Sequence, residues 1–112
     1  MQKQDCIFCK IVVDKLPSSK IAENDDVLVI KDLYPKAPIH YLILPKKHVR
    51  DISQLNEEDA HIASKLLLMA QKLSEKDEQH AQFRLISNNG PLAGQCVFHI
   101  HLHFLAGRQL DF

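Results

Sequence analysis

Three histidines recur at every second position near the end of the chain, His99, His101 and His103, with apolar residues between them. Alternate side chains of a strand point to opposite faces, so this spacing places the three imidazoles in one column. A helix would scatter them, and the period therefore predicts a strand, Val97–Leu105. Burying three adjacent imidazoles without a function would cost desolvation energy. The column therefore indicates metal binding, proton transfer or nucleophilic attack. Its opposite, apolar face would carry Phe98, Ile100, Leu102 and Phe104.

The middle histidine, His101, has the best position for nucleophilic attack. A neutral imidazole attacks phosphorus well, and an unperturbed pKa of about 6.5 leaves it largely unprotonated at neutral pH. If a backbone carbonyl accepts from its Nδ1–H, its Nε2 is free to attack. His103, nearer the end of the strand, can donate a hydrogen bond to a phosphoryl oxygen and stabilise developing charge.

The loop that leads into the histidines, residues 88–96, could hold an anion. Gly94 lets the backbone approach a ligand closely, and the N–H groups from Gly94 to Cys96 could form a nest for a phosphate. Such a phosphate would lie over the histidine column. A plain turn explains Gly94 equally well, so the loop by itself indicates only an anion near histidines.

Cys6 and Cys9 form a Cys-x-x-Cys pair near the start of the chain. The spacing suits a metal site or a redox pair, and it also arises by chance. A redox pair would be expected in a thioredoxin-like βαβ unit, and no such pattern follows. With Cys96 the cysteines number three, which is a poor set for a disulfide framework. The composition therefore favours the cytoplasm, where thiols stay reduced.

The length of 112 residues predicts one domain, residues 1–112, with a buried core. The 46% of hydrophobic and 25% of charged residues are ordinary for a soluble globular protein. The 14 basic and 14 acidic residues cancel, so no general field favours a nucleic acid or an anionic membrane as partner. No apolar run approaches the roughly 20 residues that span a bilayer, and no signal-type stretch follows Met1–Asp5.

The apolar patterning predicts an α+β fold with an antiparallel sheet of about five strands, one long helix and a short N-terminal helix. Short connections with Asn, Asp and Pro separate the apolar runs, which favours antiparallel neighbours over crossovers. The long helix would cover one face of the sheet. The predicted strands are Ile21–Glu23, Val27–Ile30, Ile39–Leu44, Phe83–Asn88 and Val97–Leu105, and the short helix lies around Cys6–Ile11.

The long helix is predicted to start after Asn56, an N-cap residue followed by acidic residues that the helix dipole favours. Apolar residues then recur at helical spacing to about Ser74. The run Leu66–Met69 is apolar nearly all round, which indicates a subunit interface or, equally, a deeply buried helix. Glu75–His80 is polar and predicts a solvated end.

The histidine strand resembles the signature of the histidine triad (HIT) superfamily, in which three histidines alternate with apolar residues. Other segments are similar in order and spacing to the Hint branch of that family, so the resemblance covers nearly the whole chain. The segments that carry it are His99–Leu105, Cys6–Ile11, Lys31–Pro38, Leu44–His48, Gly94–Gln95 and Gly107–Gln109.

The resemblance implies a homodimeric nucleotide hydrolase that binds a purine mononucleotide such as AMP or GMP and needs no organic cofactor. Hint proteins cleave purine nucleoside 5′-phosphoramidates, of the AMP-NH2 or AMP-lysine type, at the α-phosphate. His101 would become covalently nucleotidylated and His103 would assist. Asp32 would hold the ribose hydroxyls. The implied purine slot is Ile7, Phe8, Ile11, Ile30 and Leu33, and the implied contacts around the phosphate are Asn88, Gly94, Gln95, Cys96 and His103.

The resemblance also implies a structural zinc ion. Many bacterial HIT proteins carry both cysteines, and the His of a Pro-x-x-His stretch and the first triad histidine complete the ligand set. Here the ligands would be Cys6, Cys9, His48 and His99, a closed Cys2His2 site. Cys96 stands where Hint enzymes often carry serine, and a thiol is a weaker hydrogen-bond donor. The leaving-group preference therefore stays open.

Other functions remain open at this point. The same family contains dinucleoside polyphosphate hydrolases and nucleotidyl transferases. The histidine column could instead bind a catalytic zinc ion that activates water, in which case a chelator would abolish turnover. A non-catalytic regulator would bind AMP without an adduct. His40, on a strand with Leu42 and Leu44, could serve either the core or the site.

Overall fold

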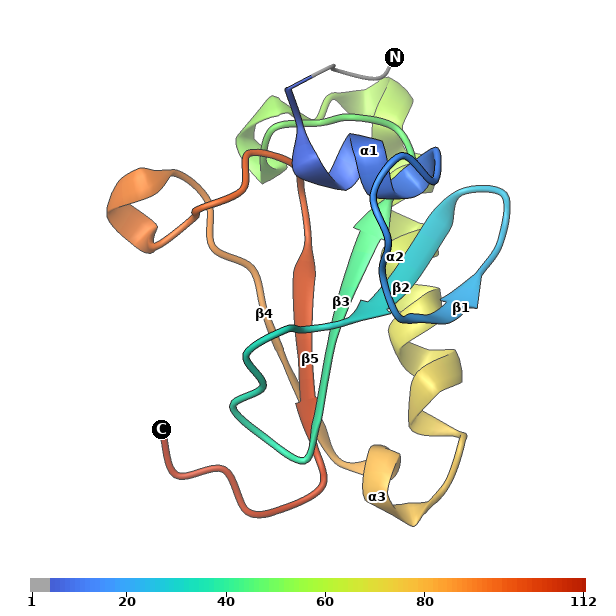
Figure 1. Ribbon diagram of the computed structural model, residues 1–112, viewed down its shortest axis with the longest axis vertical. Coiled ribbons are helices and arrows are strands. Elements are labelled where there is room, and N and C mark those ends of the chain that lie inside the picture. Colours follow the sequence, from blue (N-terminus) through green and yellow to red (C-terminus); the bar gives the residue numbers. More distant parts are fainter. Residues whose placement is uncertain (1–4) are drawn as a thin grey trace.

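The computed structural model describes residues 5–112, and within this range the strands form one five-stranded antiparallel sheet in the order β1-β2-β3-β5-β4 (Figure 1). The predicted α+β class is confirmed. Residues 1–4, which the single-domain prediction and the search for a signal segment include, lie outside the described residues. The strands are β1 (Lys20–Glu23), β2 (Val27–Lys31), β3 (Ile39–Pro45), β4 (Phe83–Ile86) and β5 (Leu102–Ala106).

The helices are short except for one. None of them, in the part of the chain that the structure describes, has the length and apolar content that crossing a membrane requires. The α-helices are α1 (Ile7–Val12), α2 (Ala60–Ser74) and α3 (Glu78–Ala81), and the 3-10 turns are η1 (Ile52–Gln54), η2 (Glu57–Asp59) and η3 (Pro91–Ala93).

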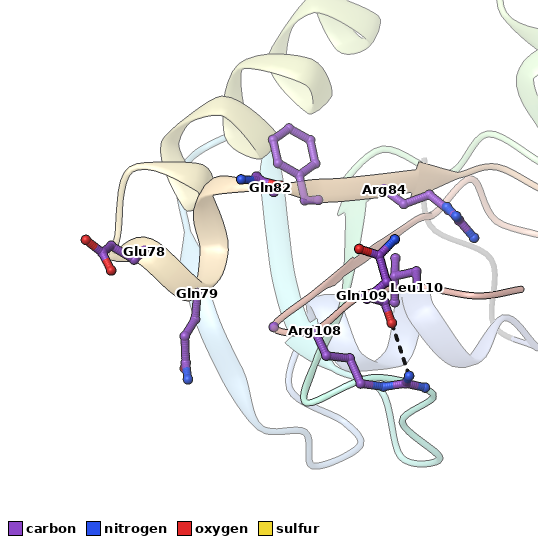
Figure 2. Close-up of a pocket in the computed structure, with 9 residues that line it drawn as sticks. Glu78, Gln79, Gln82, Arg84, Arg108, Gln109 and Leu110 are labelled. Atoms are coloured by element: carbon purple, nitrogen blue, oxygen red, sulfur yellow. Dashed lines mark hydrogen bonds between the residues drawn. The ribbon is translucent and has the colours of Figure 1, made fainter.

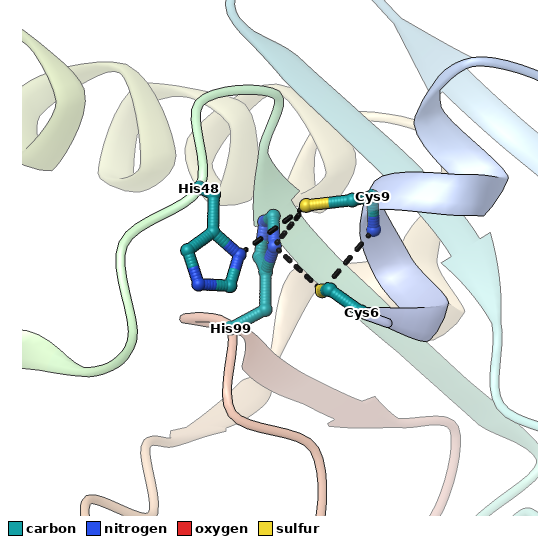
Figure 3. A group of neighbouring side chains, drawn as sticks. All are labelled: Cys6, Cys9, His48 and His99. Carbon is teal, nitrogen blue, oxygen red and sulfur yellow. Dashed lines mark hydrogen bonds between the residues drawn. The ribbon is translucent and has the colours of Figure 1, made fainter. Parts of the chain in front are cut away.

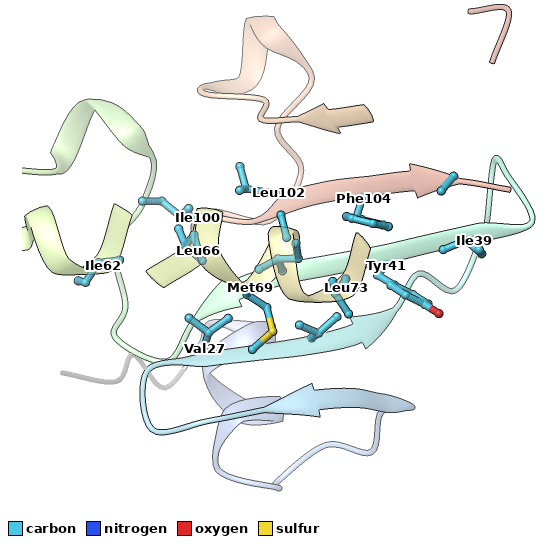
Figure 4. Close-up of a cluster of buried hydrophobic side chains, with 14 of the residues drawn as sticks. Val27, Ile39, Tyr41, Ile62, Leu66, Met69, Leu73, Ile100, Leu102 and Phe104 are labelled. Atoms are coloured by element: carbon cyan, nitrogen blue, oxygen red, sulfur yellow. The ribbon is translucent and has the colours of Figure 1, made fainter. Parts of the chain in front are cut away.

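The long helix α2 covers one face of the sheet, as predicted. Asn56 caps the preceding turn η2, with its side chain accepting from the Glu58 N–H and Asp59 completing a capping box. Ile62, Leu66, Met69 and Leu73 lie against the sheet in the main core (Figure 4). The neighbouring Leu67 and Leu68 are 59% and 55% exposed. A helix that is buried all round is therefore the wrong alternative for Leu66–Met69.

The opposite face of the sheet carries α1. Phe8, Cys9 and Ile11 are buried against alternate residues of β2 and β3, whose other residues pack under α2. The sheet is thus enclosed between α2 and the much shorter α1, with a core on each side. The second core joins Cys6, Phe8, Cys9 and Ile11 to Leu28, Ile30, Leu42 and Leu44.

The histidine strand is shorter than predicted. Its ladder with β3 begins at the pair Ile43 and Leu102, so the segment 97–101 lies outside the sheet and only His103 of the three histidines is in β5. The upstream chain is held differently, because the Ile100 N–H donates to the Val49 carbonyl at 2.8 Å. Phe98 is 44% exposed and does not join the apolar face, whereas Ile100, Leu102 and Phe104 are buried under α2.

Two further features differ from prediction. β4 ends at Ile86 rather than Asn88, because its last pair is with His103 and the chain then turns into the loop before η3. His80 is buried, so the predicted solvated end is wrong at this residue. Asp77 accepts from the His80 ring Nδ1–H at 2.7 Å, and the ring Nε2 then accepts from the Tyr41 hydroxyl at 2.9 Å.

Candidate active site

A cavity of about 860 Å³ opens on the side of the sheet that carries α1. This volume is within the range of small-molecule sites. The cavity is lined from α1, from β2 and the turn after it, from the loop before η3 and from the triad segment. Of the predicted substrate-binding residues it brings together Ile7, Phe8, Ile11, Ile30, Asp32, Leu33, Asn88, Gly94, Cys96, His101 and His103, and it leaves out Gln95.

The ring of His101 has one defined tautomer. Its Nδ1 lies 2.8 Å from the His99 carbonyl oxygen. Since a carbonyl oxygen only accepts, Nδ1 carries the proton and Nε2 keeps its lone pair. Burial lowers the pKa of His101, and the hydrogen bond to His99 opposes this effect. The imidazole is therefore neutral at pH 7 and presents a nucleophilic or basic Nε2 in the cavity.

A chain of hydrogen bonds fixes His103 in the opposite tautomer. The Lys36 backbone N–H donates to His40 Nδ1 at 3.1 Å, so the proton of neutral His40 lies on Nε2. His40 Nε2–H then donates to His103 Nδ1 at 2.9 Å. His103 must consequently carry its own proton on Nε2, which makes it a donor. Burial lowers the pKa of His103 to about 4 and also lowers the pKa of His40.

Asp32 lies beside this chain. Its Oδ2 is 3.4 Å from His40 Nε2 and 4.0 Å from His103 Nδ1, and its Oδ1 accepts from the Tyr34 N–H. Asp32, His40 and His103 thus have the residue types of a metal site, with ligand atoms within 4.8 Å of one another. The nitrogen of His40 that faces the group already carries a proton, however. The arrangement is a hydrogen-bonded cluster, in which the carboxylate favours the Nε2–H tautomer of His40.

The loop before the triad is built by its own backbone. The Gly94 N–H donates to the Pro91 carbonyl at 3.0 Å, and the Gln95 N–H donates to the Gly90 carbonyl at 3.1 Å. Gly94 adopts a φ of +94°, which glycine tolerates. The predicted nest is therefore wrong for the N–H groups of Gly94 and Gln95. The Cys96 N–H makes no hydrogen bond within residues 5–112 and stays available to an anion.

Gln95 supports this loop from beneath instead of lining the cavity. Its side-chain oxygen accepts from the Gly90 N–H at 2.7 Å, and its Nε2 donates to the carbonyls of Arg50 and Val97 at 2.7 and 3.0 Å. Three bonds to backbone groups hold the amide side chain inside the protein. Gln95 can therefore shape the loop that carries Cys96 without touching a ligand.

Some residues of the cavity were absent from the predicted set. His40 stands on β3 two residues before Leu42, which pairs with His103, so the strand register would have placed both histidines on one face. Lys36 lines the cavity from the turn before β3. Phe112 also lines it, and Arg84 donates to the Phe112 backbone carbonyl. The sequence of the tail carries no periodicity that could have revealed this position.

A second cluster joins Cys6, Cys9, His48 and His99, which we call the metal cluster (Figure 3). Cys6 Sγ lies 3.4 Å from His99 Nδ1, and Cys9 Sγ lies 3.2 Å from His48 Nδ1 and 3.6 Å from His99 Nδ1. Ligands around a tetrahedral zinc ion, with bonds of about 2.0–2.3 Å, are about 3.3–3.8 Å apart. These three separations lie in this range or within about 0.1 Å of it, and all four donor atoms lie within 4.8 Å of one another, so the cluster suits a zinc ion.

The orientation of His99 supports the same conclusion. Its Nε2–H donates to the Pro45 carbonyl at 2.7 Å, which leaves the lone pair on Nδ1, facing the two sulfurs. The ring is fully buried, and burial lowers its pKa to about 4, so it is neutral as a ligand must be. Burial also raises the pKa of the Cys6 thiol, a cost that a bound cation would offset.

A second hollow, of about 380 Å³, lies between α3, β4 and the C-terminal tail (Figure 2). Polar and charged side chains such as Glu78, Gln82 and Arg84 border it. No histidine or cysteine lines this hollow among the described residues, so it lacks the chemistry that the cavity by the triad has.

Comparisons with known proteins agree with this geometry. A family model described as the HIT domain matches residues 13–110. The chain is similar to a histidine triad protein from Clostridium difficile (39% identity, TM-score 0.94, covering 100% of this chain and 98% of that one). It is also similar to a HIT family hydrolase from Legionella pneumophila (38%, TM-score 0.91, 96% and 97%) and to a zinc-bound histidine triad family protein from Mycobacterium smegmatis (31%, TM-score 0.82, 96% and 78%). With the family model spanning most of its length, this chain belongs to the HIT-domain family.

Proposed function

We propose that this protein is a nucleotide hydrolase that cleaves purine nucleoside 5′-phosphoramidates at the α-phosphate, through a nucleotidyl group carried on His101. The observation that carries this proposal is the hydrogen bond from His101 Nδ1 to the His99 carbonyl, which leaves a neutral Nε2 lone pair in the cavity. The similarity to a HIT family hydrolase from Legionella pneumophila supports hydrolysis as the reaction class.

Each step of the proposed reaction uses a defined atom. His101 Nε2 attacks the α-phosphorus, the P–N bond breaks as the leaving nitrogen takes up a proton from solvent, and the nucleotidyl group is held on Nε2. The Nε2–H of His103 and the free N–H of Cys96 donate to phosphoryl oxygens as charge develops. Water then attacks phosphorus on the side opposite His101 and gives up a proton to solvent, the bond to Nε2 breaks, and the mononucleotide leaves.

The remaining lining residues suit a purine nucleotide. The side chains of Ile7, Phe8 and Ile30 form an apolar wall on which a flat base can pack. The carboxylate of Asp32 faces the cavity and can accept hydrogen bonds from ribose hydroxyls. Adenine and guanine both fit this description, so AMP and GMP are both proposed products.

We propose a structural zinc ion in the metal cluster, by analogy with the zinc-bound relative from Mycobacterium smegmatis. The ion would cross-link α1 to the segments that carry His48 and His99. The ligand set is complete with four protein donors, which leaves no position for substrate. A catalytic metal on the triad itself finds no support, because only His101 presents a free lone pair in the cavity: His103 carries its proton on Nε2, and the lone pair of His99 faces the cysteines.

One observation favours a second substrate class. Lys36 lines the cavity close enough for its charge to lower the pKa of both His40 and His103, and no ion pair engages it within residues 5–112. A free ammonium group near the reacting phosphate favours an anionic leaving group over the cationic side chain of lysine. Dinucleoside polyphosphates are therefore the alternative substrates.

The test is a turnover screen on AMP-NH2, AMP-lysine and a diadenosine polyphosphate, with acid trapping of the intermediate. We expect AMP-NH2 to be hydrolysed and a mass increase of one nucleotidyl group on His101. His101→Asn should lose the adduct and at least about 10³-fold in turnover while it still binds AMP, because the nucleophile is gone and the cavity remains.

His61→Asn is the matched control, since His61 is exposed on α2 and away from the cavity. Its turnover should equal that of the unmodified protein. Normal turnover in His101→Asn would contradict the proposed mechanism. Binding of AMP with no turnover of any of the three substrates would identify the protein as a nucleotide-binding regulator instead.

A further inference from the structure

We infer that the metal cluster positions the nucleotide cavity, so that a metal ion and a nucleotide bind cooperatively although they occupy separate sites. His48 is the positioning residue that allows the two sites to be tested separately, because it belongs to the metal cluster and does not line the nucleotide cavity. The inference rests on the proposed function for the identity of the nucleotide, and it concerns binding rather than turnover.

The first physical link is α1. This helix has six residues, and an isolated helix of that length is unstable in water. Its N-cap Cys6 and its Cys9 belong to the metal cluster, while Ile7, Phe8 and Ile11 line the nucleotide cavity. Anchoring the two sulfurs therefore fixes the backbone that presents the apolar wall.

The second link runs through His99. Its ring belongs to the metal cluster, and its carbonyl accepts from His101 Nδ1. Both residues lie before β5, so no strand ladder fixes this segment. Phe8 packs edge-on against both rings, with centroids 5.9 Å from His99 and 5.0 Å from His101. A shift of His99 would thus displace the carbonyl that orients the nucleophile and the aromatic ring that faces the base.

The energetic consequence follows from linkage. Without metal, the cluster is held by contacts between thiols and imidazoles, which are weak hydrogen bonds. A bound metal would join Cys6 and Cys9, at the start of α1, to His48 and His99, and would so hold α1 in the arrangement that the nucleotide needs. If α1 is ordered in only a fraction of the metal-free molecules, the apparent affinity for the nucleotide is reduced by that fraction. By reciprocity, the nucleotide raises the metal affinity by the same factor.

The test measures AMP affinity by titration calorimetry on the folded protein with zinc bound and with zinc removed by a chelator. We expect removal of zinc to weaken AMP binding on the order of tenfold, the factor expected if one molecule in ten keeps α1 ordered. Saturating AMP should tighten zinc binding by the same factor, measured by competition with a chelator of known affinity.

Variants of His48 separate positioning from general stability. His48→Ala removes a ligand outside the cavity and should give the weak AMP affinity with or without zinc. His48→Asp places a carboxylate oxygen at the reach of the imidazole Nδ1 and should restore both zinc binding and the zinc dependence of AMP affinity. His61→Ala, on the exposed side of α2, should behave as the unmodified protein.

Equal AMP affinity in the folded zinc-bound and zinc-free protein would overturn the inference. So would a failure of zinc to bind, or a His48→Ala protein that is less stable yet binds AMP normally. Turnover through His101 with zinc-independent AMP binding would overturn the inference and leave the proposed function standing. Cooperative binding of zinc and AMP without turnover would contradict the proposed function and leave the inference standing.

Discussion

Individual histidines in this protein differ in tautomer because their hydrogen-bond partners differ. His101 Nδ1 donates to a carbonyl oxygen, so the lone pair of this ring is on Nε2. His103 Nδ1 accepts from His40, so the proton of this ring is on Nε2. His99 has its proton on Nε2 and its lone pair towards the cysteines. Three residues of one type in one motif therefore present a lone pair in the cavity, a proton in the cavity and a lone pair towards the cysteines, and these are the states that the proposed nucleophile, donor and metal ligand need.

The chain of bonds that ends at His103 leads to a prediction for His40. His40→Ala removes the donor that holds His103 in its Nε2–H tautomer, so the ring can adopt the form that cannot donate to phosphate. We expect kcat for AMP-NH2 to fall about 10–100-fold while AMP affinity changes less than about threefold. His40→Gln, whose amide can still donate, should recover part of kcat.

His80→Gln provides the contrast to His40→Ala. His80 is also buried and hydrogen-bonded, but its partners are Tyr41 and Asp77, away from the cavity. This variant should lose thermal stability and keep its kcat. If His40→Ala instead loses stability with unchanged kcat, His40 serves the core alone.

The sequence allowed only part of this residue-scale chemistry to be predicted. The period of two singled out His101, and a backbone acceptor at its Nδ1 was a condition that the structure meets. The roles of His40 and Lys36 depend on contacts across β3, β5 and the turn before β3. Such contacts arise from strand register, which the apolar pattern of a single strand does not define.

Elements were easier to predict from the sequence than the site, because they depend on local patterns. The spacing of Ile62, Leu66, Met69 and Leu73 predicts α2 and its end at Ser74 correctly, whereas the predicted start after Asn56 belongs to the 3-10 turn η2 and α2 begins at Ala60. The histidine segment was predicted too long because alternation of side chains does not require a partner strand. β3 pairs β5 only as far as Leu102, so His99 and His101 alternate outside the ladder.

The prediction of a homodimer rests on the exposed leucines of α2, and the dimer remains a proposal. Leu67 and Leu68 project beside the buried stripe of the same helix, and an exposed apolar patch of this kind is typical of a protein interface. Leu67→Glu with Leu68→Glu should convert a dimer into a monomer, because four glutamates would face one another across a two-fold axis.

Analytical ultracentrifugation measures this change. Leu92→Glu is the control, since Leu92 is fully exposed in η3 and belongs to a different surface. It should leave the mass unchanged. A double variant of α2 that keeps the mass of the unmodified protein would show that the patch is not the interface. If the unmodified protein is already a monomer, the proposed dimer itself fails.

In the molecule as a whole, the two faces of the sheet differ: one carries the larger apolar core, and the other carries the candidate site beside a smaller core. Under α2, apolar residues from the sheet and helix fill the space, whereas the face under α1 combines a small core with the cavity and the metal cluster. The buried histidines on the second face are neutral in the folded protein. Folding therefore couples to pH through this face rather than through the larger core.

Acid stability tests this coupling. The pKa of His103 falls from an ordinary value of 6.5 to about 4 on folding, so the unfolded chain binds more protons than the folded chain between these values. Stability contributed by neutral His103 is complete above pH 6.5 and is lost as the pH falls through 4. For a shift of this size, roughly 2 kcal/mol is lost between pH 7 and pH 5. His40, whose pKa is also lowered by burial, changes in the same direction.

Urea unfolding of metal-free protein at pH 7 and pH 5 measures this loss, in a range where most carboxylates remain ionised. The free energy of unfolding should be lower at pH 5 than at pH 7. His103→Asn should reduce the difference between the two pH values by about the amount that one histidine contributes. His61→Asn, which changes an exposed imidazole on α2, should leave the difference between the two pH values intact. Equal stability at both pH values in the unmodified protein would mean that His103 is solvated and titrates near 6.5. A donor with an ordinary pKa would then be charged in part at pH 6, and the neutral hydrogen-bond chain through His40 could not be the state that binds phosphate.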